Sequence, residues 1–539
     1  MNQVATNGAA PERVDVVIIG AGFSGMYAIH RLRDKHKIVC FEAGAGVGGT
    51  WYWNRYPGAR VDIQSVEYSY GFDNDLQQEW KWPEYFSAQP DLERYANHVA
   101  DRFKLRDHIR FSNRITSMHF DEAANEWHVY AEKGDHVIAR HVIAATGALS
   151  IPNTPPWPGR EKFKGPIYHT ADWPREGVDF TGKRVGFIGT GSTGIQAMPI
   201  IASQAKHLTV FQRTPAFCMP SGNRPLDEEC EKDWKAHYPE RRQQMLNTYG
   251  ASMVVYPTKA VHECTLEERE KILEEAWNSQ SAFQLLVAFS DVMSNKEAND
   301  IVSEFARNKI RAIVKDPETA EKLCPKTYPI GGKRLCIGNG YFEMYNRDNV
   351  TLVDVKAAPI TAYTDKGLKT TEAEYELDAI VTATGFDAIT GSLDRIDVEG
   401  VGKRKLKEKW SEGPTTYLGT MVAGFPNMFM IHGPMTPAAQ AQMITTGEWQ
   451  VNWVADIIED MEAKKITRID TTEEAEKWWQ DELNTASSYT VHHLADSWYN
   501  AKNIEGKKGG FMIYVGGFDR FKKFSEDAVA EGYKGFVLA

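Results

Sequence analysis

Two groups of glycines, each directly after a short apolar run, are the residues of this chain best suited to binding chemistry. In the first group, Gly20, Gly22 and Gly25 have the spacing GxGxxG. The first glycine of such a group makes a tight turn, the second lets a pyrophosphate approach the backbone, and the third lets a helix pack close to a strand. Glu42 follows about 20 residues later, where an acid accepts from a ribose hydroxyl. This group therefore predicts a site for FAD or NAD.

The second group of glycines has the same spacing and consists of Gly189, Gly191 and Gly194. The apolar run that follows it, HLTVFQRT, has Gln212 where the first unit has its acid, and Arg213 comes next. A carboxylate at this position repels a 2′-phosphate, whereas a neutral residue followed by arginine accommodates one. The second group therefore predicts an NADP site. Two dinucleotide sites in one chain suggest a flavin that is reduced by a nicotinamide.

A third stretch, FKGPIYHTADWP at residues 163–174, lies between the two glycine groups and contains His169 and Trp173. It has neither strand alternation nor helical periodicity, so we interpret it as a linker. Histidine is the most common general acid or base, whereas tryptophan usually contributes buried area and one N–H hydrogen bond. The stretch alone leaves a catalytic and a packing role open for these two side chains.

The elements that must position these groups follow from the apolar pattern. Short apolar runs, such as residues 14–19, precede both glycine groups and suit buried parallel strands, and a helical pattern follows from Met26. Two later runs, residues 141–147 and 378–385, end in Ala-Thr-Gly and are interpreted as strands that return the chain beside each nucleotide. The predicted fold class is therefore α/β, with two Rossmann-like dinucleotide-binding domains.

Residues 227–325 have a different pattern, with charged segments of helical periodicity. Thr265 and Glu268 have the spacing of a capping box at a helix N-terminus. We predict a helical insertion in the NADP domain, which either shapes a site or is a structural elaboration. The predicted order of domains is FAD-binding (1–150), NADP-binding with the linker (151–226), helical insertion (227–325), NADP-binding (326–386) and FAD-binding (387–539).

Composition and charge exclude several other classes of function. The chain has 539 residues, of which 42% are hydrophobic, and its net charge of −11 argues against a nucleic-acid partner. Its six cysteines contain no CxxC pair, which argues against a dithiol redox motif or a metal site. No apolar run approaches the roughly 18 residues that cross a bilayer, and no secretory leader is evident. We therefore expect a cytoplasmic protein that is not bound to a membrane and has no obligate protein partner.

These features together resemble the type I Baeyer–Villiger monooxygenases, which carry FAD and NADPH on one chain. The family fingerprint FxGxxxHxxxW, followed by Pro or Asp, is matched by Phe163, Gly165, His169, Trp173 and Pro174. A second family pattern is matched in GGTWYWNRYPGARVD by Gly48, Gly49, Trp51, Tyr56, Pro57, Gly58 and Asp62. The resemblance spans essentially the whole chain. Related monooxygenases that oxidise nitrogen or sulfur usually end the fingerprint in Tyr or Phe, so Trp173 favours the Baeyer–Villiger branch.

The resemblance implies a reaction in which NADPH reduces FAD, O2 forms a C4a-peroxyflavin, and the peroxide attacks a ketone to yield an ester or lactone. The developing negative charge needs a fixed cation in a water-poor site, and arginine suits this role. The resemblance places that arginine at Arg334, with Asp62 as its expected carboxylate partner. Because Arg334 takes the stabilising role, we expect His169 to organise the linker and the domain interface and Trp173 to be a packed anchor. Direct catalysis by His169 is the alternative.

The resemblance also implies contacts with FAD and with the phosphates of NADP. Gly49, Trp51 and Asp62 are expected to contact FAD together with the first glycine group and Glu42. Contacts with the NADP phosphates are expected where the second helix begins, from Thr190, Ser192, Thr193 and Gln196. No metal ligand is implied.

At the two ends of NADP the resemblance implies three further contacts. Lys333 is expected to bind the 2′-phosphate beside Arg213, and Trp498 is expected to lie near the nicotinamide. Relatives commonly have Gly-Ala before an asparagine just after this tryptophan, whereas this chain has Ala501-Lys502-Asn503. Loss of the glycine could alter how this segment closes over the cofactor.

Two other functions stay open at this stage. An N- or S-oxygenating flavin monooxygenase is the alternative within enzymes. A flavin reductase with a protein partner belongs to another class, but the chain has no CxxC or iron–sulfur spacing to carry electrons away. The ketone is open among linear, cyclic, aryl and steroidal ones. Its pocket is expected to include residues near Met435–Thr436 and parts of the helical insertion.

Overall fold

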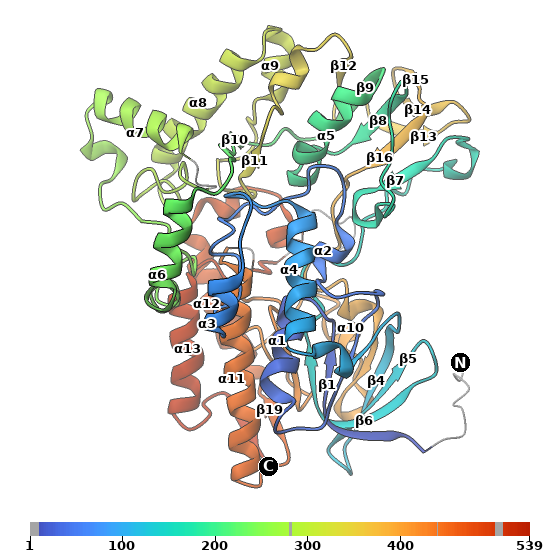
Figure 1. The fold of residues 1–539 in the computed structure, drawn as a ribbon, viewed down its shortest axis with the longest axis vertical. Helices are drawn as coiled ribbons and strands as arrows, with labels where there is room; N and C mark the ends of the chain where they lie inside the picture. The colour runs from blue at the N-terminus through green and yellow to red at the C-terminus, as the bar shows by residue number, and fades with distance from the viewer. Residues whose placement is uncertain (1–9, 280–282, 439, 502–509) are drawn as a thin grey trace.

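The computed structural model describes residues 10–279, 283–438, 440–501 and 510–539, and in them two large sheets of mainly parallel strands have helices around them (Figure 1). The first sheet has eight strands in the order β17-β4-β5-β6-β1-β2-β3, with β18 beside β6. Its central strands are apolar because helices or loops cover both faces, and all four residues of β2 are buried. The strands are β1 (Glu12–Ile19), β2 (Ile38–Phe41), β3 (Ile109–Arg110), β4 (Ile115–Asp121), β5 (Glu126–Ala131), β6 (His136–Ala144), β17 (Asp397–Glu399) and β18 (Met428–Met430).

Segments from both ends of the chain complete this first sheet. Strand β17 pairs with β4 and β18 pairs with β6, although both come late in the sequence. Helix α1 (Phe23–Leu32) packs against α11 (Met443–Ala463), and Tyr27 donates a hydrogen bond to Asn452 Oδ1 at 2.9 Å. The late part of the chain therefore supports the sheet that holds the first glycine group.

The second sheet has five parallel strands in the order β12-β9-β8-β16-β7. They are β7 (Ile167–His169), β8 (Arg184–Ile188), β9 (His207–Gln212), β12 (Val350–Asp354) and β16 (Ala379–Thr382), and helix α5 (Ser192–Gln204) follows β8. The α/β fold class predicted from the sequence is confirmed. Strand β7 differs from the prediction, because the stretch that we interpreted only as a linker forms the edge strand of this sheet. Three residues are too few for alternation to be visible in the sequence.

The helices of the insertion lie in the left and upper part of Figure 1, with α7 to α9 above α6. Its helices are α6 (Glu228–Met245), α7 (Leu266–Asn278), α8 (Lys296–Ile313) and α9 (Pro317–Leu323). The predicted capping box is confirmed, since Thr265 Oγ1 accepts from Glu268 N at 3.2 Å and the Glu268 carboxylate accepts from Thr265 N at 2.8 Å. Helix α6 contacts the part of the chain around the first sheet through Arg242. The Arg242 side chain is buried, and its guanidinium donates a hydrogen bond to the backbone carbonyl of Glu67.

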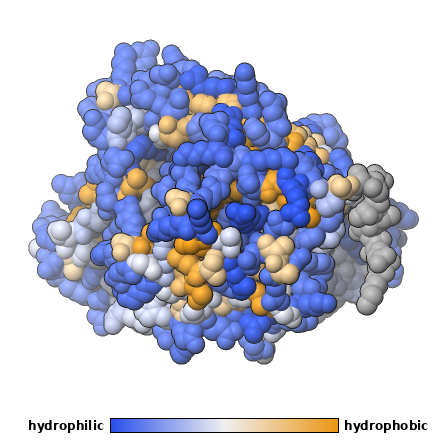
Figure 2. Space-filling view, turned by 90° about the horizontal axis from the view of Figure 1, so that it is seen from below, coloured by the Kyte–Doolittle hydropathy of each residue, from blue (hydrophilic) through white to orange (hydrophobic). Residues whose placement is uncertain are grey.

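The remaining elements surround these parts. Helices α11, α12 and α13 lie side by side at the lower left of Figure 1. The other elements are α2 (Thr50–Trp53), α3 (Asn74–Glu79), α4 (Gln89–Arg102), α10 (Leu406–Lys409), α12 (Glu473–Ser488), α13 (Phe518–Ala530), β10 (Cys218–Pro220), β11 (Cys336–Gly338), β13 (Ile360–Tyr363), β14 (Gly367–Thr370), β15 (Glu374–Glu376), β19 (Ile469–Thr471) and β20 (Phe536–Leu538). The face shown in Figure 2 is mostly hydrophilic, with apolar residues in small groups. Among the helices of the described residues, none combines the length and apolar character that crossing a membrane requires.

Candidate active site

The turn between β1 and α1 requires glycine at two positions. Gly20 has a φ of +98°, and a Cβ there would lie 2.6 Å from the carbonyl oxygen of Ala145. A Cβ at Gly25 would lie 1.8 Å from the Gly20 carbonyl oxygen, so only glycine lets α1 pack this close to β1. Gly22 is the N-cap of α1, and a Cβ there would first meet Gly49 Cα at 3.5 Å. The N-terminus of α1 therefore offers backbone N–H groups to an anion.

Glu42 follows β2 and is buried beside this turn. Its Oε2 accepts from Ala21 N at 2.7 Å, and its Oε1 accepts from Gly44 N at 2.6 Å. Burial raises the pKa of Glu42, and these two backbone N–H groups lower it in part. Each carboxylate oxygen has a second acceptor position, so Glu42 can also accept from a ribose hydroxyl.

A cavity of about 1320 Å³, the larger cavity, connects the two glycine groups. A Cβ at Gly191, where α5 begins, would meet no atom within 4 Å, so the backbone there is open to a ligand. Backbone N–H groups at two helix N-termini and a buried carboxylate fit a pair of dinucleotides such as FAD and NADP. Residues predicted as cofactor contacts that line this cavity are Gly20, Gly22, Glu42, Gly49, Trp51, Asp62, Gly191, Ser192, Thr193, Gln196 and Trp498.

The turn between β8 and α5 repeats the geometry of the first turn. Gly189 has a φ of +105°, and a Cβ there would lie 2.3 Å from the carbonyl oxygen of Ala383. A Cβ at Gly194 would lie 2.4 Å from the Gly189 carbonyl oxygen. Thr190 fixes the turn from inside, since its hydroxyl donates to the carbonyl oxygen of Thr214 at 2.9 Å. This hydroxyl is therefore already used within the protein, whereas we expected it near the phosphates.

Gln196 joins the two halves of the molecule. Its Oε1 accepts from the Tyr56 hydroxyl at 2.9 Å, and its Nε2 donates to the carbonyl oxygen of Arg60 at 3.2 Å. Gly58 packs against the same turn of α5, since a Cβ there would lie 2.4 Å from the Gln196 carbonyl oxygen. The YPGAR segment is thus bound to the second sheet's helix, and the amide of Gln196 makes interdomain hydrogen bonds rather than being held ready for a phosphate.

Lys333 and Arg213 bring two positive charges together beyond the end of β9. Burial lowers the pKa of Lys333, the charge of Arg213 lowers it further, and Asp496 opposes this effect. The Lys333 ammonium lies 4.9 Å from the centroid of the Tyr328 ring. Because two adjacent cations repel each other until an anion joins them, this arrangement suits a phosphate.

Arg334 and Asp62 are in direct contact. The guanidinium donates from Nε at 2.9 Å and from Nη2 at 2.7 Å, both to Asp62 Oδ2. The Phe283 ring lies against the same guanidinium, with 5.2 Å from Cζ to the ring centroid. Although burial disfavours the charge of Arg334, Asp62 raises the pKa of the guanidinium, so it stays charged. The structure therefore holds a permanent cation at this point.

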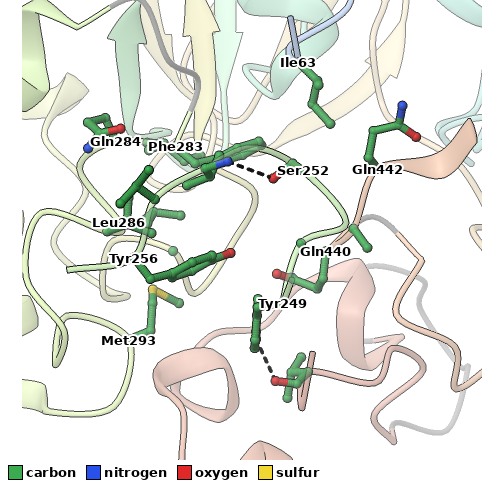
Figure 3. A pocket seen from close by; sticks show the side chains of 18 of the residues that line it. Ile63, Tyr249, Ser252, Tyr256, Phe283, Gln284, Leu286, Met293, Gln440 and Gln442 are labelled. Carbon is green, nitrogen blue, oxygen red and sulfur yellow. Dashed lines mark hydrogen bonds between the residues drawn. The ribbon is translucent and has the colours of Figure 1, made fainter. Parts of the chain in front are cut away.

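This ion pair lies where the larger cavity meets a second one. The second cavity, the smaller cavity, has a volume of about 870 Å³, and Asp62 and Arg334 line both. The insertion contributes much of its wall, as expected, and Figure 3 shows Tyr256, Leu286 and Met293 on one side and Gln440 and Gln442 on the other. Residues near Met435–Thr436 line these cavities, as expected, with Gln440 and Gln442 in the smaller one and His432 in the larger one, although Met435 and Thr436 themselves are not among the described lining residues. The side chains of Met435 and Thr436 are buried instead.

Trp498 and Tyr499 stand on opposite sides of this junction. Trp498 lines the larger cavity, Tyr499 lines the smaller one, and their ring centroids are 4.6 Å apart. Ala501, which replaces the expected glycine, has a φ of +58°, a conformation that favours glycine. Lys502 and Asn503 lie outside the described residues.

The fingerprint stretch packs on the second sheet and away from Arg334. Phe163 is buried, and Gly165 has no space for a side chain, since a Cβ would lie 2.5 Å from the carbonyl oxygen of Asp378. Trp173 is 4% exposed and packs in the core of this sheet. The His169 Nδ1 accepts from Ala171 N at 3.1 Å, and His169 is not among the described residues that line either cavity. The structure does not bring His169 to the ion pair.

Several residues of the site have no signal in the sequence. Phe283, which contacts Arg334, and Glu67, which lines the smaller cavity, belong to no motif. They reach the site through the fold of the insertion and of the loop after Asp62. No group of three or more histidine, cysteine or acidic residues suited to a metal ion occurs in the part of the chain that the structure describes.

The chain is similar to known proteins over nearly its whole length. The family described as flavin-binding monooxygenase-like matches residues 13–254. A curated relative, a Baeyer–Villiger monooxygenase of Pseudooceanicola batsensis, is 40% identical over 97% of this chain and 96% of its own. A solved structure of an oxidised steroid monooxygenase bound to NADP is 46% identical, with a TM-score of 0.93 over 98% of this chain and 99% of that one. A complex of OTEMO with FAD and NADP is 40% identical, with a TM-score of 0.94 over 98% and 100% of the two chains.

Proposed function

The chain belongs to the Baeyer–Villiger monooxygenases among the flavin-binding monooxygenases, and from this premise we propose that it uses FAD, NADPH and O2 to convert a ketone into an ester or lactone. The observation that carries the proposal is the position of the Arg334–Asp62 pair, at the junction of the two cavities. The larger cavity suits the two cofactors, and the smaller one has a mixed lining in which apolar side chains such as Leu286 and Met293 can contact a ketone. We further propose that the protein acts without an obligate protein partner.

The cofactor sites are assigned to residues of the larger cavity and its two turns, and for the 2′-phosphate also to Arg213 and to Lys333, which lines the smaller cavity. When bound, FAD would supply the redox chemistry, that is, acceptance of a hydride from NADPH and activation of O2. FAD is held by Gly20, Gly22, Gly25, Glu42, Gly49, Trp51 and Asp62. NADP is held by Gly189, Thr190, Gly191, Ser192, Thr193, Gly194, Gln196, Arg213, Lys333 and Trp498. The side chains of Thr190 and Gln196 already bond within the protein.

Arg334 stabilises the negative charge that develops on oxygen during the reaction. Its side chain is 21% exposed and so largely shielded from water, and a fixed cation acts most strongly where water is excluded. Asp62 accepts from two of its donors and so fixes the plane of the guanidinium. The Phe283 ring packs against the same guanidinium. The site thus needs no reorganisation when charge develops, and Asp62 acts by positioning Arg334.

The fingerprint stretch has a positioning role in this proposal. Trp173 anchors it in the core of the second sheet, and His169 bonds to the turn at Ala171, which lines the larger cavity. His169 therefore organises the edge of the cofactor site and takes no part in the chemistry. The six cysteines are free, which supports a reducing, cytoplasmic setting.

The proposal is tested with a panel of ketones and the FAD-loaded protein. We expect an ester or lactone from at least one ketone, with one NADPH consumed per product. In Arg334→Ala, we expect the flavin still to accept a hydride from NADPH, which is seen as bleaching of the flavin. Ester formation should fall by at least about 100-fold. Ester yields at the normal rate from this variant would contradict the role of Arg334. A thioether offered beside the ketone distinguishes the alternative, since an S- or N-oxygenating enzyme would leave every ketone unchanged.

A further inference from the structure

Glu67 is a buried acid that the proposed mechanism does not use. It is 5% exposed and lines the smaller cavity together with Asp62 and Arg334. Its carboxylate accepts one hydrogen bond among the described residues, from Met253 N to Oε2 at 3.2 Å. The other oxygen, Oε1, has no donor in the described part of the chain.

The arginines beside Glu67 bond to other groups, except that Arg241 Nη1 has no hydrogen-bond partner among the described residues. Arg242 Nη1 donates to the backbone carbonyl of Glu67 at 2.7 Å, and its Nη2 donates to the Ser69 hydroxyl at 2.7 Å. Arg241 donates to Asp233 Oδ2 at 2.6 Å. Buried charged groups in proteins are nearly always paired. A carboxylate with a single backbone donor in a ligand cavity is therefore suited to a polar group of the ligand.

The acid is held in a mixture of its two forms near neutral pH. Burial raises the pKa of Glu67 to about 7, while Met253 N–H and the charges of Arg242 and Arg241 act in the opposite direction. A hydroxyl both donates and accepts, so it pairs with the ionised and with the protonated acid. A second carbonyl pairs only with the protonated form. An ammonium group is disfavoured, because these arginines and Arg334 are all cationic.

The size and lining of the smaller cavity suit a bulky apolar ligand. Its volume of about 870 Å³ lies in the upper part of the range for small-molecule sites, which leaves space for a bulky ligand. Leu286 and Met293 project into it in Figure 3. Val255 and Tyr489, which also line it, are 79% and 72% exposed, so apolar surface continues to the outside. Such exposed apolar side chains beside a cavity suit the entry of a compound that is poorly soluble in water.

We propose that the ketone of this enzyme is a multi-ring compound with a hydroxyl group away from its carbonyl, and that Glu67 binds this hydroxyl. The inference rests on the proposed function, because it assumes that the ketone carbonyl lies at Arg334. A polar group bound in this way gives strong selection against analogues that lack it, since the buried acid would then be left unpaired.

The experiment compares two steroids with a ketone at carbon 17, one with a hydroxyl at carbon 3 and one without it. Binding to the FAD-loaded protein is measured by equilibrium dialysis, and kcat/KM is measured from ester formation, with cyclohexanone as a third ketone. We expect the hydroxylated steroid to bind about tenfold more tightly than its counterpart. Glu67→Leu, whose side chain has a similar volume, should bring the ratio of the two binding affinities close to one. Its kcat/KM should fall more for the hydroxylated steroid than for cyclohexanone.

Two further variants separate recognition from folding. Glu67→Gln keeps the shape of the side chain and can both donate and accept, so it keeps most of the preference for the hydroxyl. Gln64→Ala is the control, because it removes another polar side chain of the same cavity. We expect it to leave the ratio of the two steroid affinities unchanged. Equal binding of the two steroids by the unchanged protein, or an unchanged ratio in Glu67→Leu, would overturn the assignment. Absence of ester from every ketone would contradict the proposed function instead, and the binding ratio would still decide the role of Glu67.

Discussion

Arg334 directs two donors, Nε and Nη2, at a single oxygen of Asp62, and the pair stands where the two cavities meet. The two residues are 272 positions apart in the sequence. A carboxylate that receives both donors on one oxygen fixes the plane of the guanidinium. The pair thus places a guanidinium of fixed orientation between the larger cavity, on the cofactor side, and the smaller cavity, on the ketone side. A reaction that develops negative charge on oxygen requires such a fixed cation.

Substitutions of Asp62 distinguish orientation from charge. Because both donors meet on Oδ2, the amide oxygen of Asp62→Asn can accept them, whereas Asp62→Ala removes the acceptor. We expect ester formation to fall about tenfold in Asp62→Asn and about 100-fold or more in Asp62→Ala. The rate of ester formation by the FAD-loaded variants is the measurement, with thermal unfolding to show that both fold. Equal losses in the two variants would mean that the negative charge of Asp62, and not its orienting bond, is required.

The cations at Lys333 and Arg213 predict the choice between NADPH and NADH. Removing Arg213 leaves the 2′-phosphate with one cation and relieves the charge repulsion on Lys333. In Arg213→Ala we expect KM for NADPH to rise about tenfold or more, while KM for NADH changes little. Flavin reduction followed by stopped-flow absorbance gives both values, and NADH is the internal control. An equal rise in KM for NADPH and for NADH would mean that Arg213 does not contact the 2′-phosphate.

How far the sequence predicts the site depends on how local each feature is. The two glycine groups and Glu42 were predicted because a strand, a turn and a helix carry their whole signal. Glu67 could not be predicted, because it enters the smaller cavity only through the packing of the insertion against the loop after Asp62. The expectation for the region near Met435–Thr436 located the right part of the chain, but the sequence could not show that these two side chains are buried and that neighbours such as Gln440 and Gln442 line the cavity.

The fingerprint stretch shows the same limit at the level of the fold. Strand β7 was missed because its three residues pair with β16, and β16 lies far away in the sequence. The same pairing places His169 opposite Thr382 at the edge of the second sheet. The predicted helices of the insertion depend on local periodicity and caps, and the capping box of α7 was accordingly visible in advance.

The buried acid Glu67 predicts a pH dependence of stability. Its pKa is raised from an ordinary 4.5 to about 7, so the folded chain binds this proton more tightly than the unfolded chain. The unchanged protein therefore loses stability through this group as the pH rises from about 4.5 to 7. Glu67→Gln removes the effect, so its stability relative to the unchanged protein should increase by about 2–3 kcal/mol between pH 5 and pH 8. Urea midpoints at the two pH values measure this, and a difference that stays constant would show that Glu67 is not buried as an acid.

His169 is expected to control coupling and not the chemical step. Its Nδ1 holds the turn at Ala171 and Asp172, and both of these residues line the larger cavity. In His169→Ala this edge loosens, so we expect slower turnover and a several-fold larger share of NADPH consumed with release of hydrogen peroxide, while the content of FAD stays unchanged.

Asparagine at position 169 supplies the matched control. Its side-chain oxygen can accept from Ala171 N as the imidazole does, so His169→Asn should restore much of the coupling that His169→Ala loses. The measurement is the ratio of ester and peroxide formed to NADPH consumed. A general acid or base would behave differently, because asparagine cannot transfer a proton at that step and both variants would then fail equally. Loss of ester with coupling intact in both variants would therefore assign His169 to the reaction itself.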